Sequence, residues 1–151
     1  MISIVAPMFN EEVVLNYFFK SIAETLNKTG REYEIICVND GSKDGTYERL
    51  LEFRDNNPRI KILNLARNFG KEIALTAGLD HCSGDAIIPI DCDLQDPPSV
   101  ILEMIEKWEE GFDMVLAKRI DRRSDSWMKR ATSSLFYSTI SKLSEVEIPP
   151  N

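Results

Sequence analysis

The chain has 151 residues, 43% of them hydrophobic and 28% charged, which is enough for one globular domain with a sizeable core. Its formal net charge of −7 argues against general nucleic-acid binding, because that activity needs a broad basic surface. Three cysteines without C-x-x-C spacing and a single histidine argue against a disulfide framework, a zinc knuckle and any mechanism that needs two histidines.

Apolar runs alternate with amphipathic segments along the chain. We predict strands over 2–6, 34–38, 60–65, 86–90 and 114–117. We predict helices over 12–28, 44–55 and 70–79, a helix that begins at Pro97, and a last helix over 127–143. Ser42 or Asp44 can cap the second helix, and Asp96 before Pro97 has the sequence of a helix start. No segment approaches the roughly 20 apolar residues of a membrane span, and the strand directly after Met1 leads us to expect no signal peptide.

Regular alternation of strands and helices predicts an α/β fold with a mostly parallel sheet and helices on both faces. In such sheets ligands bind beyond the carboxyl ends of the strands. A polar cluster follows each predicted strand, at 7–11, 39–42, 67–71, 91–96 and 118–123. We therefore expect all five clusters to converge on one edge of the sheet.

The cluster after the fourth strand is dense in carboxylates. Asp91 and Asp93 lie two residues apart, so in extended backbone both can reach one cation. Carboxylate oxygens suit Mg²⁺ or Mn²⁺ rather than zinc, and Gln95 could add an amide oxygen. The alternative is an acidic turn before a helix; we assign Asp96 to the helix cap and Asp91 and Asp93 to the metal.

Two further clusters are ambiguous when each is taken alone. Asn39 or Asp40 could accept a hydrogen bond from a nucleobase, and Gly41 permits a close backbone approach, but the segment could equally be an Asx turn. Asn10 and Glu11 after the first strand could bind a ligand or only start a helix.

A basic segment stands out in this acidic chain. Six cations occupy the thirteen positions from 118 to 130: Lys118, Arg119, Arg122, Arg123, Lys129 and Arg130. They could form a solvated basic face, a phosphate site or a patch that faces an anionic membrane surface.

Together these motifs resemble glycosyltransferase family 2, and more narrowly its polyprenyl-phosphate glycosyltransferases, the group of dolichol-phosphate mannose synthase and the bactoprenol glucosyltransferases. The matching segments are P-M-F-N-E at 7–11, V-N-D-G-S at 38–42, R-N-F-G-K-E at 67–72, D-C-D-L-Q-D-P at 91–97, A-K-R at 117–119 and K-R at 129–130. These motifs, in this order over nearly the whole chain, make the resemblance specific. It implies a GT-A fold, a Rossmann-like three-layer α/β/α arrangement.

The resemblance also implies an activity, which is inverting transfer of a sugar from a nucleotide-diphosphate donor to a membrane polyprenyl phosphate. Glucose and UDP are the expected sugar and nucleotide. It implies Mg²⁺ or Mn²⁺ on Asp91, Asp93 and Gln95, with both aspartates in catalysis. Nucleotide binding falls to Pro7, Asn10, Glu11, Asn39, Asp40, Lys71 and Asp91, and lipid-phosphate binding to Arg119, Lys129 and Arg130. We expect no nucleic-acid partner and leave self-association open.

Two departures from the family pattern bear on function. Many relatives have Asp where this chain has Asn39, whose oxygen can still accept from a uracil N–H. Relatives also continue past the position of Asn151 with a further active-site segment and membrane helices. We therefore interpret residues 1–151 as an N-terminal catalytic domain, soluble by itself, from an enzyme at the cytoplasmic face of the bacterial inner membrane.

Two alternative functions remain at this stage. The 151 residues could be a nucleotide-sugar-binding module that is inactive alone, or a family 2 transferase that acts on a saccharide hydroxyl. The second alternative needs a base for a neutral hydroxyl, and no motif here supplies one. We assign a structural role to His81, which falls at a helix end outside the motifs.

Overall fold

The computed structural model describes residues 1–117 except 94 and 96, and residues 1–115 form one compact unit. Its four strands form one parallel sheet in the order β3-β2-β1-β4, with β1 at Ile2–Met8, β2 at Tyr33–Asn39, β3 at Ile60–Asn64 and β4 at Ala86–Pro89. The helices are α1 (Leu15–Asn27), α2 (Thr46–Asn56), α3 (Lys71–Leu79) and α4 (Ser99–Glu109). All strand pairs are parallel, as predicted.

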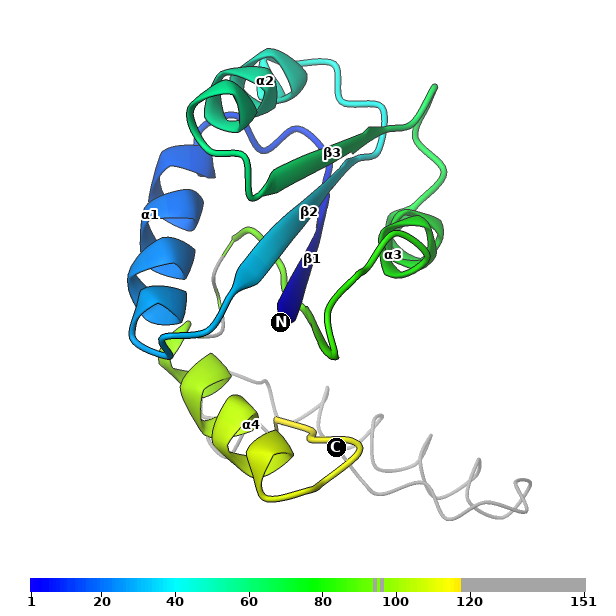
Figure 1. Cartoon of the computed structure of the whole chain (residues 1–151). Coiled ribbons are helices and arrows are strands. Elements are labelled where there is room, and N and C mark those ends of the chain that lie inside the picture. Colours follow the sequence, from blue (N-terminus) through cyan, green and yellow to red (C-terminus); the bar gives the residue numbers. More distant parts are fainter. Residues whose placement is uncertain (94, 96, 118–151) are drawn as a thin grey trace, which may run out of the picture. The chain divides into compact units, whose positions relative to one another are not determined.

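The helices cover both faces of the sheet, so the layers are α/β/α (Figure 1). One face carries the larger core, in which Ile4 of β1 and Ile35 of β2 pack with side chains of α1, α2 and α4. On the other face Ile36 and Val38 of β2 pack against Ala74 of α3. Strand β2 is buried along its whole length, which matches the almost uninterrupted apolar run of its sequence.

Helix α3 packs unusually close to the sheet because Gly78 has no side chain. A Cβ atom at Gly78 would lie 2.4 Å from Cγ1 of Val5 and 3.0 Å from Cγ2 of Val38. This close contact fixes the height of α3 above β1 and β2. Its first residue, Lys71, is thereby held at the carboxyl edge of the sheet.

From β1 to β4 the predicted elements agree with the structure except at several boundaries. Strand β1 extends through Met8 because it still pairs with Asn39 there. Helix α1 begins at Leu15 instead of residue 12, since Asn10 adopts a left-handed conformation with φ 58° and a separate turn follows it. Helix α2 begins at Thr46, whose N–H donates to the carboxylate of Asp44 at 3.1 Å.

Two predictions for the second half of the chain are wrong. Helix α4 begins at Ser99, so Pro97 is not its first residue, and Asp96 lies outside the described residues. The predicted strand over 114–117 does not form, and in the described part of the chain these residues pair with none of the four strands. Met114 is 77% exposed as a result. The predicted helix over 127–143 lies outside the described residues.

Candidate active site

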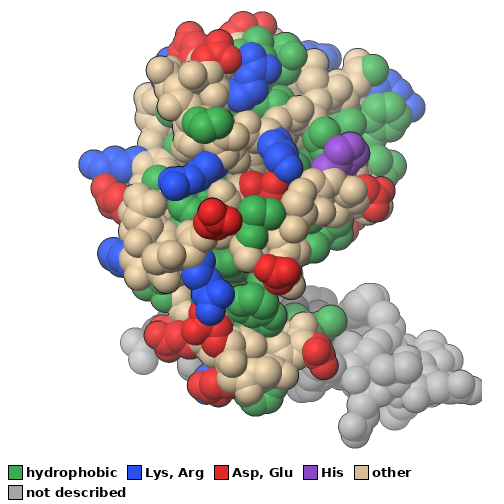
Figure 2. Space-filling model, in the orientation of Figure 1, with side chains coloured by type: hydrophobic (Ala, Val, Ile, Leu, Met, Phe, Trp, Pro, Cys, Tyr) green, Lys and Arg blue, Asp and Glu red, His purple; other side chains and the backbone are tan. Residues whose placement is uncertain are grey.

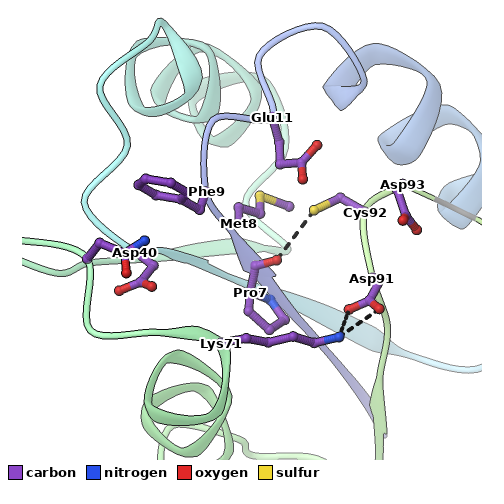
Figure 3. Close-up of a pocket in the computed structure, with 10 residues that line it drawn as sticks. Pro7, Met8, Phe9, Glu11, Asp40, Lys71, Asp91, Cys92 and Asp93 are labelled. Atoms are coloured by element: carbon purple, nitrogen blue, oxygen red, sulfur yellow. Dashed lines mark hydrogen bonds and ion pairs between the residues drawn. The ribbon is translucent and has the colours of Figure 1, made fainter.

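A pocket of about 330 Å³ lies at the carboxyl edge of the sheet, where the segments after β1, β2, β3 and β4 meet (Figure 3). This volume falls within the range of small-molecule sites. Its lining consists of ten residues: Pro7, Met8, Phe9, Glu11, Asp40, Asn68, Lys71, Asp91, Cys92 and Asp93. Four of the five polar clusters predicted to converge therefore do so, and the fifth, at 118–123, lies outside the described residues.

The segment after β1 is tied to the segment after β2 through Asn10. The backbone N–H of Asn10 donates to Oγ of Ser42 at 2.9 Å, and its Oδ1 accepts the N–H of Lys43 at 2.8 Å. The N–H of Glu11 donates to Oγ1 of Thr46 at 2.8 Å. These bonds use the side chain of Asn10 for loop structure and leave that of Glu11 to line the pocket.

Asp40 joins the segment after β2 to the segment after β3. Its carboxylate is 3% exposed and accepts the backbone N–H groups of Phe69 at 2.8 Å and Gly70 at 2.9 Å. The backbones also touch, since a Cβ atom at Gly41 would lie 2.4 Å from the carbonyl carbon of Arg67. Gly41 has φ 65°, a conformation that L side chains rarely adopt. Asp40 thus holds the turn that leads directly into Lys71 and helix α3.

Lys71 and Asp91 form an ion pair across the pocket. The ammonium nitrogen of Lys71 lies 2.7 Å from both carboxylate oxygens of Asp91 (Figure 3). The hydrogen bond that Lys71 donates to this carboxylate raises the pKa of Lys71 above its usual value, against the opposing effect of burial. The pair connects α3 to the segment after β4, two elements on different sides of the pocket.

Cys92 anchors the acidic segment between its two aspartates. Its thiol is 3% exposed and donates to the carbonyl oxygen of Pro7 at 3.4 Å, while Asp91 and Asp93 on either side are exposed. Burial, and after it the nearby carboxylate of Glu11, raises the pKa of Cys92 to about 12. Cys92 is therefore a neutral buried anchor rather than a nucleophile.

Carboxylates dominate the electrostatics of the pocket. Burial raises the pKa of Glu11 above its usual value, and the negative charges of Asp93, Asp44 and Asp91 raise it further. Over the face of the described residues that Figure 2 shows, acidic and basic side chains are interspersed. A cation that entered the pocket would meet a negative potential offset only in part by Lys71.

The donor set at this edge fits a hard divalent cation that takes part of its coordination from a ligand. No group of three or more His, Cys, Asp or Glu side chains within the described residues could hold a metal by itself. Asp91 and Asp93 offer exposed carboxylates, which is the usual protein share of a Mg²⁺ or Mn²⁺ site completed by phosphates and water. Asp93 keeps its orientation by accepting the N–H of Gln95 at 3.1 Å.

The structure brings together six of the residues predicted for the site: Pro7, Glu11, Asp40, Lys71, Asp91 and Asp93. Asn10, Asn39 and Gln95 do not line the pocket. Asn39 is buried, and its amide donates to Oδ1 of Asn64 at 2.7 Å and accepts the N–H of Ser42 at 3.3 Å. The predicted lipid-phosphate residues Arg119, Lys129 and Arg130 lie outside the described residues.

Four pocket residues were missing from the predicted site: Met8, Phe9, Asn68 and Cys92. Phe9 carried a usable signal, because an aromatic residue in a polar segment after a strand has no core to enter, and it is 40% exposed. Outside the pocket, Nδ1 of His81 bonds to the carbonyl oxygen of Ala77 at 2.8 Å, in keeping with a structural role at the end of α3.

The fold and the pocket define a class, the Rossmann-like α/β proteins that bind a ligand beyond the carboxyl ends of parallel strands. Within it, the chain belongs to glycosyl transferase family 2, whose sequence model matches residues 3–148. Over 150 residues the chain is 52% identical to an uncharacterized glycosyltransferase of Synechocystis sp., and over 150 residues it is 50% identical to a bactoprenol glucosyl transferase of Shigella phage SfV. Each alignment covers 99% of this chain, with 47% of the Synechocystis protein and 49% of the phage protein, so the chain spans about half the length of these relatives.

Solved structures show the same GT-A fold at low sequence identity. Glucosyl-3-phosphoglycerate synthase from Mycobacterium tuberculosis in complex with UDP superposes with a TM-score of 0.63 at 22% identity, over 99% of this chain and 53% of that one. A mannosyltransferase from Pyrobaculum calidifontis in complex with GDP-mannose and Mn²⁺ superposes with a TM-score of 0.63 at 23% identity, over 78% and 35% of the two chains. Among the described residues no helix is both long enough and apolar enough to cross a membrane.

Proposed function

We propose that this chain is the donor-binding catalytic part of an inverting glycosyltransferase that moves glucose from UDP-glucose to a membrane polyprenyl phosphate. The observation that carries the proposal is the pocket in which Asp91, Asp93 and Lys71 meet at the carboxyl edge of the sheet. The bactoprenol glucosyl transferases, about 50% identical over nearly the whole chain, support the sugar and the acceptor. The UDP complex of a structure with the same fold supports the nucleotide.

In this proposal the two exposed aspartates hold the donor through a divalent cation, Mg²⁺ or Mn²⁺. The cation would neutralise charge that develops on the diphosphate leaving group. Lys71 supplies a further positive charge on the opposite wall of the pocket. Cys92 fixes the backbone between the two carboxylates, so that neither must be ordered when the donor arrives.

The nucleobase is assigned to the other end of the pocket, at Phe9 and Asp40. An exposed aromatic ring offers a stacking face to a base, and Asp40 has lone pairs beyond those that accept Phe69 and Gly70. Asn39, which the sequence suggested for the base, is engaged with Asn64. Asn39 therefore stabilises the sheet edge beside the pocket through its bond to Asn64.

The acceptor chemistry explains why no general base is needed. The nucleophile is an oxygen of a phosphate monoester, which is largely ionised at neutral pH because its second pKa is about 6. Positioning this anion beside the anionic donor is the remaining requirement, and Arg119, Lys129 and Arg130 are proposed for it. A polyprenyl acceptor would place the complete enzyme at a membrane, on the cytoplasmic side where nucleotide sugars are available.

Substitution of Asp93 tests the proposal. In the complete enzyme, Asp93→Asn should lower transfer of radiolabelled glucose from UDP-glucose into extractable lipid by at least about 100-fold, because the developing diphosphate charge loses its counter-ion. Asp80→Asn, which removes an exposed carboxylate at the end of α3, should leave transfer unchanged. Undiminished transfer by Asp93→Asn would contradict the assignment.

A further inference from the structure

The position of Lys71 is unusual for a lysine. It is the first residue of α3, where the helix dipole presents its positive end and disfavours a cation. The neighbouring Glu72 carries the negative charge that the first turn of a helix favours, whereas Lys71 carries a positive charge. The side chain nevertheless has a defined partner, because its ammonium group lies 2.7 Å from both oxygens of Asp91.

The same two oxygens are the ones that a divalent cation would take. Asp91 is 54% exposed and Asp93 lies two residues further along the same segment; within residues 1–117 apart from 94 and 96, Asp91 is the one of the two that pairs with a lysine. An ammonium at 2.7 Å from both oxygens fills the position from which one cation would be held by both oxygens of Asp91. A metal held by both oxygens of Asp91 therefore requires Lys71 to move.

Lys71 is able to move. It is 58% exposed, and its flexible four-carbon chain starts from a helix end that Asp40 holds in place through Gly70. The displaced ammonium of Lys71 would find a second ionic partner in the pocket, because a diphosphate bound to the cation would place negative charge beside the lysine.

We propose that Lys71 is an internal counter-ion that occupies the cation position at Asp91 until the donor arrives and then transfers to the donor diphosphate. The inference rests on the proposed function. It makes cation and nucleotide binding cooperative, because the cation must displace Lys71 and the diphosphate gives the displaced lysine a new partner. The unliganded protein therefore binds divalent cations weakly, and the charge of Asp91 stays compensated without metal.

Mn²⁺ binding to the 151-residue chain tests this directly, with the free ion followed by electron paramagnetic resonance. Without nucleotide, Lys71→Gln should bind Mn²⁺ about fivefold more tightly than the wild type, because Asp91 is released from an exposed ion pair. With Mn²⁺ present, the same variant should bind UDP about tenfold more weakly in calorimetry, because a charge-assisted contact is lost.

Three matched variants exclude simpler explanations. Lys71→Arg keeps the charge and should bind Mn²⁺ as the wild type does. Lys20→Gln removes one exposed positive charge from α1, away from the pocket, and should change neither affinity. In the Asp91→Asn background, Lys71→Gln should no longer tighten Mn²⁺ binding, since the two residues act as a pair.

The outcomes separate this inference from the proposed function. Unchanged or weaker Mn²⁺ binding by Lys71→Gln, or equal tightening by Lys20→Gln, would overturn the role of Lys71 even if UDP binds normally. Absence of UDP binding by the wild type would overturn the proposed donor and the transfer of Lys71 to it. The Mn²⁺ comparison would then still decide whether Lys71 competes for Asp91.

Discussion

Single residues within one motif have different roles in this pocket. Asn39 and Asp40 are neighbours at the end of β2, yet the amide of Asn39 bonds to Asn64 inside the sheet edge, whereas Asp40 lines the pocket and holds the turn before α3. Asp91 and Asp93 point to the pocket while Cys92 between them is buried. Successive side chains along these segments point in different directions, which separates the two roles. The packing of the neighbouring segments decides which residue faces the pocket.

Thiol labelling should report on the anchored acidic segment. At pH 8 in the native state, Cys82 should react with iodoacetamide first, because Cys37 and Cys92 are buried and burial raises the pKa of both thiols, that of Cys92 to about 12. We expect their modification to be about 100-fold slower or more than that of Cys82. Mass spectrometry of the peptides measures the three sites separately.

Labelling of the unfolded protein is the control for this experiment. In concentrated guanidinium chloride the three thiols should react at similar rates, because burial is removed. Rapid native-state labelling of Cys92 would show that the segment carrying Asp91 and Asp93 is not held to the carbonyl of Pro7.

At the scale of elements, α3 matters because it carries Lys71 to the pocket. It is short and rich in small residues, and this composition lets it lie directly on β1 and β2 through Gly78. The carboxylate of Asp40 fixes its beginning and the ring of His81 bonds near its end. The position of Lys71 in the pocket therefore depends on contacts at both ends and the middle of the helix.

Gly78→Ala should displace this helix. The new methyl group would lie 2.4 Å from Cγ1 of Val5, and the valine is stiff and buried, so we expect a loss of about 1–3 kcal/mol in the free energy of unfolding. The better helix propensity of alanine offsets up to about 1 kcal/mol of this loss. Urea denaturation followed by circular dichroism measures the difference.

A second substitution isolates the steric cause. In a Val5→Ala background the added methyl group has room, so Gly78→Ala should lower the free energy of unfolding less there than in the wild type. An equal cost in both backgrounds would mean that the contact with Val5 does not set the height of α3.

At the scale of the whole molecule, a polar network centred on buried Glu34 joins β1, β2, β3 and the segment before β4, at the edge of the sheet opposite the pocket. Glu34 of β2 accepts Oγ of Ser3 from β1 at 2.5 Å and the N–H of Ser83 before β4 at 2.6 Å, and it pairs with Lys61 of β3 at 2.5 Å. Burial alone would raise the pKa of Glu34, but the bonds from Lys61, Ser3 and Ser83 outweigh it and lower the pKa below its usual value.

This network predicts an acid-dependent stability. Because the folded-state pKa of Glu34 lies below the unfolded value, its contribution is present above pH 4.5 and is lost as the pH falls through the lowered pKa. Glu34→Gln should therefore lower the free energy of unfolding by about 1–3 kcal/mol at pH 7, and by much less near pH 3. Denaturation curves at pH 7, 5, 4 and 3 measure how the free energies of unfolding of Glu34→Gln and the wild type converge as the pH falls.

Glu24→Gln on the surface of α1 is the matched control, because Glu24 meets Lys20 only at 3.9 Å and is well exposed. It should leave the pH dependence close to that of the wild type. Parallel stability curves for Glu34→Gln and the wild type between pH 7 and pH 3 would contradict the role given to the network.

The sequence by itself determined the alternating α/β architecture, the four parallel strands β1 to β4 and the edge at which polar segments gather, because periodicity and chain order carry that information. It also pointed to Asp91 and Asp93 through their spacing. The sequence also predicted a strand over 114–117 that the structure does not contain. An apolar run forms a strand only where it pairs with another strand, and the run alone does not show whether it does.

The tertiary structure alone decided which side chains face the pocket and which face each other. Lys71 and Asp91 are 20 residues apart, and no local pattern predicts that their charges meet at 2.7 Å. The motif suggested the same role for Asn39 and Asp40, but only Asp40 lines the pocket, because the segment after β3 supplies N–H donors to Asp40 whereas Asn39 bonds to Asn64. Contacts between segments distant in sequence arise from packing, and packing depends on the whole fold rather than on any one motif.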